Sequence, residues 1–223
     1  MERIIKVTGR GKVSAKPDTI RVNINADGTY PEYADAIRKS AEDTELLRMA
    51  MASAGLDPKE LKTSYFNVNT EYENYQYDTY NWKQKFIGYK YIHSMYIQFP
   101  ADNEVLGKVL GELSKCGVSA DFNIDYTVKD TDALKNELLA KAVSDSREKA
   151  MVLTKAAGVE LGDIVNIDYS WGEMEIYTRS MCFGGMDTKA RVEDSSIDLS
   201  IEPEDINLQD TVTVIWEIKT ANR

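Results

Sequence analysis

Residues 19–27, TIRVNINAD, decide the fold class of this chain, because apolar and polar side chains alternate strictly along them. One face of this stretch carries four apolar side chains, Ile20, Val22, Ile24 and Ala26. A period of two is typical of a β-strand with one buried and one solvated face. Such strands favour an antiparallel or mixed sheet over a parallel sheet that is covered on both sides.

Three later segments repeat the pattern, at residues 120–128, 164–170 and 211–219. We expect the apolar side of each strand to face the helices. The side chains predicted to point inward are Phe122, Ile124, Tyr126, Val128, Val165, Ile167, Tyr169, Val212, Val214, Trp216 and Ile218.

Three helices are predicted between these strands, over residues 29–54, 102–115 and 131–157. Thr29 and Glu32 have the spacing of a capping box, and Asp102 is a good N-cap for the second helix. Each helix ends at a glycine, which adopts the left-handed conformation that follows a helix without strain. These glycines are Gly55, Gly117 and Gly158. The same unit of helix, glycine and strand occurs three times, which is consistent with an internal duplication of the sequence.

Composition favours one compact domain over residues 1–223. The 223 residues are 43% hydrophobic, which is enough to bury one large core. The sequence therefore predicts an α+β fold, with a mixed or antiparallel sheet and three helices packed on one face. The formal net charge of −10 opposes binding to a polyphosphate, so we expect no nucleic acid partner.

Two segments lack periodicity, at residues 70–84 and 172–196, and we interpret both as loops or long hairpin tips. The first contains a group of large rings that are candidates for protein contact, most simply with a second copy of the chain. They are Tyr72, Tyr75, Tyr77, Tyr80 and Trp82. Tyrosine and tryptophan are enriched in interfaces. The alternative is a hairpin whose rings fold back on their own sheet.

The stretch VTGRGKVSAKPD, residues 7–18, raises the question of a phosphate site. A P-loop fails because Lys6 stands where its first glycine belongs and Val13 where its hydroxyl belongs. A dinucleotide fingerprint fails because Ser14 replaces the third glycine and a strand follows. Gly9 and Gly11 more often mark a bulge or a close backbone approach. We therefore expect no nucleotide and no cofactor.

No catalytic or metal constellation emerges from the pattern. His93 is the only histidine and lies on an apolar strand face, where a hydrogen-bonded core role is commoner than a catalytic one. The two cysteines, Cys116 and Cys182, do not have the spacing of a zinc site or of a redox dithiol. We interpret them as unpaired thiols, and a disulfide between them is the alternative. The C-terminal acids lack an EF-hand register and are interpreted as a solvated face, although a carboxylate pair stays open. These acids are Glu193, Asp194, Asp198, Glu202, Glu204, Asp205 and Asp210.

No stretch approaches the roughly 18 consecutive apolar residues of a membrane span, so we expect no membrane insertion. The printed chain opens with Met1-Glu2-Arg3-Ile4, without the apolar core of a signal peptide. This absence does not decide the compartment.

Several stretches together resemble the SIMPL family of bacterial domains. The opening strand matches the pattern I-x-V-x-G-x-G followed by PD, at Ile5, Val7, Gly9, Gly11, Pro17 and Asp18. The middle is similar at residues 63–66 and 88–89. The third helix matches A-x-x-D-A-R-x-K-A over residues 142–150, with Ser146 in place of the usual alanine. The chain departs from the family at Glu204, where glycine is usual before the last strand.

The resemblance implies an exported or envelope-associated protein linked to stress responses, with homo-oligomers and without established catalytic residues. The interpretation that follows is a noncatalytic binding or assembly protein. A carboxylate-dependent hydrolase and a small-ligand carrier are the alternatives, and the latter requires a sizeable apolar pocket.

Overall fold

The chain folds into two compact units. The computed structural model of the protein describes residues 3–78, 81–169, 176, 181–183 and 201–220. The central unit lies within residues 18–127 and 179–203, and the terminal unit within residues 1–17, 128–178 and 204–223. Pairing between residues 4–15 and 206–220 builds a second sheet with a core of its own, and the single domain expected over residues 1–223 stays a prediction.

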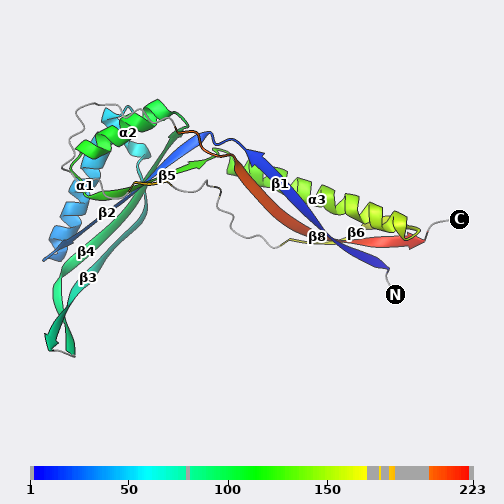
Figure 1. Ribbon diagram of the computed structural model, residues 1–223, viewed down its shortest axis with the longest axis horizontal. Coiled ribbons are helices and arrows are strands. Elements are labelled where there is room, and N and C mark those ends of the chain that lie inside the picture. The colour runs from blue at the N-terminus through cyan, green and yellow to red at the C-terminus, as the bar shows by residue number, and fades with distance from the viewer. Residues whose placement is uncertain (1–2, 79–80, 170–175, 177–180, 184–200, 221–223) are drawn as a thin grey trace. The chain divides into compact units, whose positions relative to one another are not determined.

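The central unit carries two helices on one face of a five-stranded sheet (Figure 1). Its elements are β2 (Thr19–Tyr30), α1 (Tyr33–Ser53), the 3-10 turn η1 (Pro58–Glu60), β3 (Lys62–Asp78), β4 (Asn81–Pro100), α2 (Asn103–Lys115), β5 (Ala120–Thr127) and β7 (Met181–Phe183). The strand order is β3-β4-β2-β5-β7, and every neighbouring pair is antiparallel. From β2 to β5, this β-α-β-β-α-β succession is the ferredoxin-like arrangement.

The core of the central unit lies between the sheet and the two helices. The inward face of β2 is fully buried, as its alternation predicts, and so is Ile124 on β5. Across the interface lie Leu47 and Met51 of α1 and Leu106 and Val109 of α2. The α+β class with antiparallel pairing is thereby confirmed.

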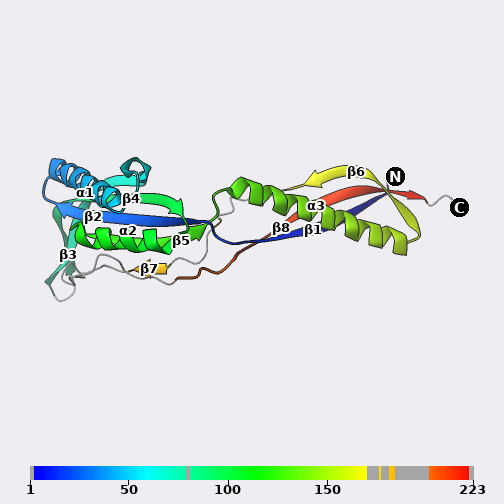
Figure 2. The same ribbon diagram turned by 90° about the horizontal axis from the view of Figure 1, so that it is seen from above.

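The terminal unit packs one long helix on a three-stranded antiparallel sheet. Its elements are β1 (Ile4–Ala15), α3 (Thr131–Ala156), β6 (Val159–Asp168) and β8 (Ile206–Thr220). The strand order is β1-β8-β6, and β1 pairs with β8 from Ile4 opposite Glu217 to Ala15 opposite Ile206. Figure 2 shows α3 running along β1 and β8. Val214 and Trp216 of β8 are buried, as predicted.

Gly9 and Gly11 let α3 approach β1 closely. A Cβ atom built on Gly9 would collide with the carbonyl oxygen of Ala142, and one on Gly11 with that of Leu138. The obstacles belong to the helix backbone, which cannot rotate away as a side chain can. The close-approach interpretation of this stretch is therefore confirmed.

The predicted helix ends are confirmed, while one predicted helix start is wrong. Gly55, Gly117 and Gly158 have positive φ values of 88°, 74° and 69°. Asp102 caps α2 by accepting from the N–H of Glu104 at 2.8 Å. The predicted capping box at Thr29 and Glu32 does not form, because β2 continues to Tyr30 and α1 begins only at Tyr33.

The inward orientation predicted for residues 164–170 is wrong for Val165 and Ile167, which are both exposed. Among the described strands, β6 pairs with β8 alone and lies at the edge of the sheet. Its pairing is interrupted by register shifts between Leu161 and Asn166. Leu161 still packs against the core of this unit, whereas Ile164, Val165 and Ile167 are left exposed.

Candidate protein-contact site on the β3–β4 hairpin

The β3–β4 hairpin extends beyond the rest of the central sheet. The last residue of β2, Tyr30, pairs with Tyr89 of β4, and β3 is the first strand in the sheet order. Residues 82–88 of β4 therefore pair only with residues 71–76 of β3 among the described residues. We refer to these two segments as the ribbon, which Figure 1 shows as the free end of the paired strands.

Gly88 fixes the point at which the ribbon leaves the sheet. Its φ of 149° lies in the region that favours glycine, and a Cβ there would collide with the carbonyl oxygen of Tyr30. The strand pairing also shifts register between Glu71 and Tyr72, which oppose Gly88 and Phe86 respectively. A bulge of this kind bends the strand and increases its twist.

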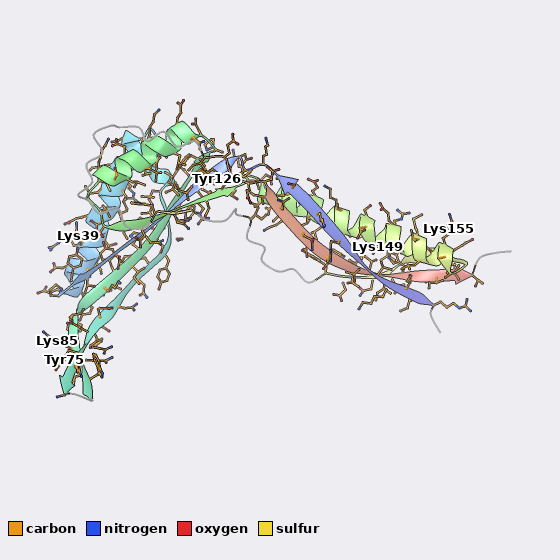
Figure 3. The ribbon with its side chains drawn as sticks, in the orientation of Figure 1. Lys39, Tyr75, Lys85, Tyr126, Lys149 and Lys155 are labelled. Atoms are coloured by element: carbon orange, nitrogen blue, oxygen red, sulfur yellow. The ribbon has the colours of Figure 1, made fainter. Side chains whose placement is uncertain are left out.

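The register divides the ribbon into two faces with different chemistry. Tyr72 opposes Phe86 and Gln76 opposes Trp82, so these side chains share one face, the aromatic face. On the other face, the charged face, Glu73 opposes Lys85 and Tyr75 opposes Lys83. Figure 3 marks Tyr75 and Lys85 near the free end of the ribbon.

Three of the five candidate rings are exposed on the ribbon. The exposed fraction is 50% for Tyr72, 42% for Tyr75 and 65% for Trp82. The side chains of Tyr77 and Tyr80 lie outside the described residues. The structure thus places the three described candidates together, with Tyr75 on the charged face and the other two on the aromatic face.

Phe86 is a further surface ring that the sequence interpretation missed. It is 44% exposed and packs edge to face on Tyr72, with ring centroids 5.7 Å apart. A chain of such contacts continues from Phe86 to Tyr89 at 5.4 Å and from Tyr89 to Tyr33 of α1 at 5.5 Å. The spacing of four residues between Trp82 and Phe86 puts both rings on one face of a strand, and this spacing was the signal that the sequence offered. The ribbon is therefore anchored to the helical side of the unit by ring packing.

His93 lies in the core between β4, α1 and β3 and is a hydrogen-bonded residue. Its Nδ1 lies 3.1 Å from the Ser40 hydroxyl and its Nε2 lies 2.8 Å from the Thr63 hydroxyl. Burial lowers the pKa of His93 from its ordinary value, and the nearby positive charge of Arg48 lowers it further. No carboxylate contacts the ring among the described residues, so the charge-orienting member of a hydrolytic triad is missing there.

The other predicted positions do not form a site within the described part of the chain. There, no group of three or more His, Cys, Asp or Glu side chains is arranged to hold a metal. Asp210 accepts a hydrogen bond from Tyr169 at 2.8 Å, and Glu202, Glu204 and Asp205 are exposed. Glu193, Asp194 and Asp198 lie outside the described residues.

Cys116 is a free thiol whose Sγ donates to the Leu113 carbonyl, and burial raises its pKa. The side chain of Cys182 lies outside the described residues. The expectation that Cys182 is likewise an unpaired thiol therefore stays a prediction.

A family model described as a protein of unknown function (DUF541), SIMPL, matches residues 5–216. The chain belongs to the SIMPL family. The matched range spans both compact units, including the strand with Gly9 and Gly11 and the helix against which they pack. The resemblance stated from the sequence is confirmed.

Two curated relatives of this SIMPL protein are each named a 26 kDa periplasmic immunogenic protein. One is from Brucella melitensis biotype 1 and the other from Brucella abortus strain S19. Each is 29% identical over 217 residues, which cover 96% of this chain and 84% of the relative. In the described part of the chain, no helix is both long and apolar enough to cross a membrane.

Proposed function

We propose that this SIMPL protein is a noncatalytic assembly protein of the bacterial envelope that binds a second copy of itself through the ribbon. The observation that carries the proposal is the exposure of Tyr72, Trp82 and Phe86 on one face of a two-stranded projection. Large rings contribute stiff contact surface at low entropic cost, and they are enriched where proteins meet.

The envelope location is supported by the relatives, whose printed names call them periplasmic. A second copy is the partner that is present wherever the protein is present. The ribbon projects from a sheet that is otherwise packed against two helices, so association there leaves the core of the central unit intact.

The decisive experiment removes one exposed ring from each face of the ribbon. The double variant Tyr75→Ser, Trp82→Ser is expected to have a lower mass in light scattering than the wild-type protein at tens of micromolar, because weak specific association has dissociation constants on the order of micromolar. Far-ultraviolet circular dichroism should be unchanged, since neither ring belongs to the buried core.

The matched control is Met49→Gln, which removes a side chain of similar exposure, 63%, from α1. This variant should keep the wild-type mass. A wild-type protein that is monomeric at this concentration, or a double variant that assembles as the wild-type protein does, would overturn the proposal.

A further inference from the structure

The ribbon has two open edges, one on each strand. Before Tyr89, residues 82–88 of β4 have no described neighbour except β3, because the pairing of β4 with β2 begins at Tyr89, opposite Tyr30. On its other side β3 has no described neighbour, since it is the first strand in the sheet order. Open edges present unpaired backbone groups that can pair with another strand. A second copy can therefore extend the ribbon on either side.

The two edges carry opposite charge. The β3 side of the ribbon contains Glu71 and Glu73, and the β4 side contains Lys83 and Lys85. Glu73 lies directly opposite Lys85, but neither forms an ion pair with another described side chain. Both side chains are exposed. They are thus available to a neighbouring strand as well as to each other.

The pairing that joins β3 to β4 within one copy can be repeated between copies. If β4 of one copy pairs with β3 of the next in the same register, each Lys85 lies between two Glu73 side chains, its own and its neighbour's. Directly opposed side chains are about 4.5–5.5 Å apart at Cβ, close enough for oppositely charged groups to interact. The Tyr72–Phe86 ring contact repeats between copies by the same register.

A symmetric contact is disfavoured by the same charges. Pairing β4 with β4 would set two lysine-bearing strands side by side, and pairing β3 with β3 would do the same for two glutamate-bearing strands. Like charges directly opposite each other destabilise a strand pair. Charge complementarity therefore selects one β3 edge and one β4 edge for each contact.

We propose that copies of this chain associate head to tail, with the β4 edge of one ribbon added to the β3 edge of the next and Lys85 paired with Glu73 across the contact. This inference rests on the proposed self-association and specifies its geometry. Head-to-tail contacts of this kind close into rings or extend as filaments, according to the rotation between copies.

The test uses two opposite charge reversals, Lys85→Glu and Glu73→Lys. The first variant has acidic side chains on both strands at this pair, and the second has basic ones. Each alone should associate at least about tenfold more weakly than the wild-type protein, because like charges then meet across the contact. Mixing the two in equal amounts should restore association, since every contact between unlike copies is again complementary.

Restoration on mixing separates contacts between copies from contacts within a copy, because each variant keeps its own mismatched pair in the mixture. The reversals Lys108→Glu on α2 and Glu202→Lys are controls for net charge and should leave association unchanged. Circular dichroism checks that each variant is folded.

A second measurement needs no variant. Equal amounts of ¹⁴N- and ¹⁵N-labelled wild-type protein are treated with a carbodiimide, which joins carboxylates to nearby amines. Cross-linked Glu73–Lys85 peptides of mixed isotope are expected. If the cross-link forms only between peptides of one isotope, or if mixing the reversals fails to restore association, the head-to-tail geometry is wrong while the proposed self-association stands. A monomeric wild-type protein would contradict both the head-to-tail geometry and the proposed self-association.

Discussion

The carboxylate of Asp145 on α3 accepts a hydrogen bond from the backbone N–H of Arg10 on β1 at 2.6 Å. Lys149, one helical turn further on, pairs with Asp145 at 2.7 Å and donates to the Thr8 carbonyl at 3.4 Å. The helix thus satisfies backbone groups of β1 that the pairing with β8 does not use. Covering an edge strand with a helix protects it from pairing with other chains.

We predict that Asp145→Ala lowers the free energy of unfolding by about 1 kcal/mol, the typical net contribution of one hydrogen bond near the surface. The pKa of Asp145 lies below its ordinary value, mainly because of the hydrogen bond from Lys149 and to a smaller extent because of the Arg10 N–H. The stabilisation is therefore present above the unfolded pKa of the carboxyl and is lost as pH falls through the lowered folded pKa. Urea unfolding at neutral and acid pH measures both effects.

Asp145→Asn is the matched control, because the amide oxygen still accepts from Arg10. It should lose less stability than the alanine variant at neutral pH. If the two variants are equally destabilised, the backbone hydrogen bond is not the source of the effect.

Gly9→Ala is predicted to be strongly destabilising. The new methyl group would meet the backbone of α3 at Ala142, so the helix must move off the sheet. Overpacking of a core costs about 1–3 kcal/mol, and we expect at least the upper end here because no side chain can rotate away. Thermal and urea unfolding of the purified variant measure the loss.

Gly117→Ala separates crowding from backbone strain. No atom lies within 4 Å of a Cβ built there, but its φ is +74°. Only the cost of a left-handed residue remains, about 1 kcal/mol. A Gly9 variant no less stable than the Gly117 variant would show that α3 is not held against β1 as described.

Tyr91→Phe tests a buried contact between β4 and α1. The Tyr91 hydroxyl donates to Asp43 at 2.5 Å, and Lys39 pairs with the same carboxylate at 2.8 Å. Removing the hydroxyl leaves a buried carboxylate with one partner fewer, and hydrogen bonds to charged groups contribute about 1.5–3 kcal/mol. Unfolding in urea should show a loss in that range. Tyr65→Phe, at a half-exposed ring on β3, should change stability by less than about 0.5 kcal/mol.

The local patterns predicted several of the elements but not how the elements assemble. Alternation identified the buried faces of β2 and β8 correctly, since period two follows directly from strand geometry. The division into two units depends on pairing between residues 4–15 and 206–220, which no local window contains. Thr29 was assigned to a helix because its spacing to Glu32 fits a cap, whereas β4 holds it in β2 opposite Lys90.

For the candidate site, the aromatic residues could be identified from the sequence, but the face of the ribbon on which each one lies could not. The bulge between Glu71 and Tyr72 shifts the pairing by one residue, and a shift of one residue exchanges the two sides of a strand. Phe86 therefore could not be placed beside Tyr72 from the pattern alone.

We predict that neither ATP nor NAD binds at residues 9–12. Both phosphate motifs are incomplete, and these residues form the middle of β1, whereas phosphate sites of this kind use the N-terminus of a helix. Isothermal titration calorimetry of the purified protein with each nucleotide should give no binding heat. Micromolar binding that Lys12→Ala abolishes would contradict the prediction.

Because His93 is the single histidine of the chain, a change in the free energy of unfolding near its pKa can be assigned to it. Burial holds the pKa of His93 below its ordinary value, so the folded state keeps the ring neutral where the unfolded chain already binds a proton. The free energy of unfolding should therefore fall as pH drops through the unfolded pKa of about 6.5, and level off below the lowered folded pKa. Urea unfolding between pH 7.5 and pH 5, at constant ionic strength, measures the decrease.

His93→Gln supplies the control, since glutamine can still bond to Ser40 and Thr63 but does not titrate. Its stability should be flatter than that of the wild-type protein across the interval near pH 6.5. Carboxylates such as Asp145 titrate at lower pH and affect both proteins alike. If the variant does not fold, the ring resonances of His93 can be followed by NMR in the wild-type protein without ambiguity. A folded-state pKa at or above 6.5 would contradict the burial of a neutral ring at this position.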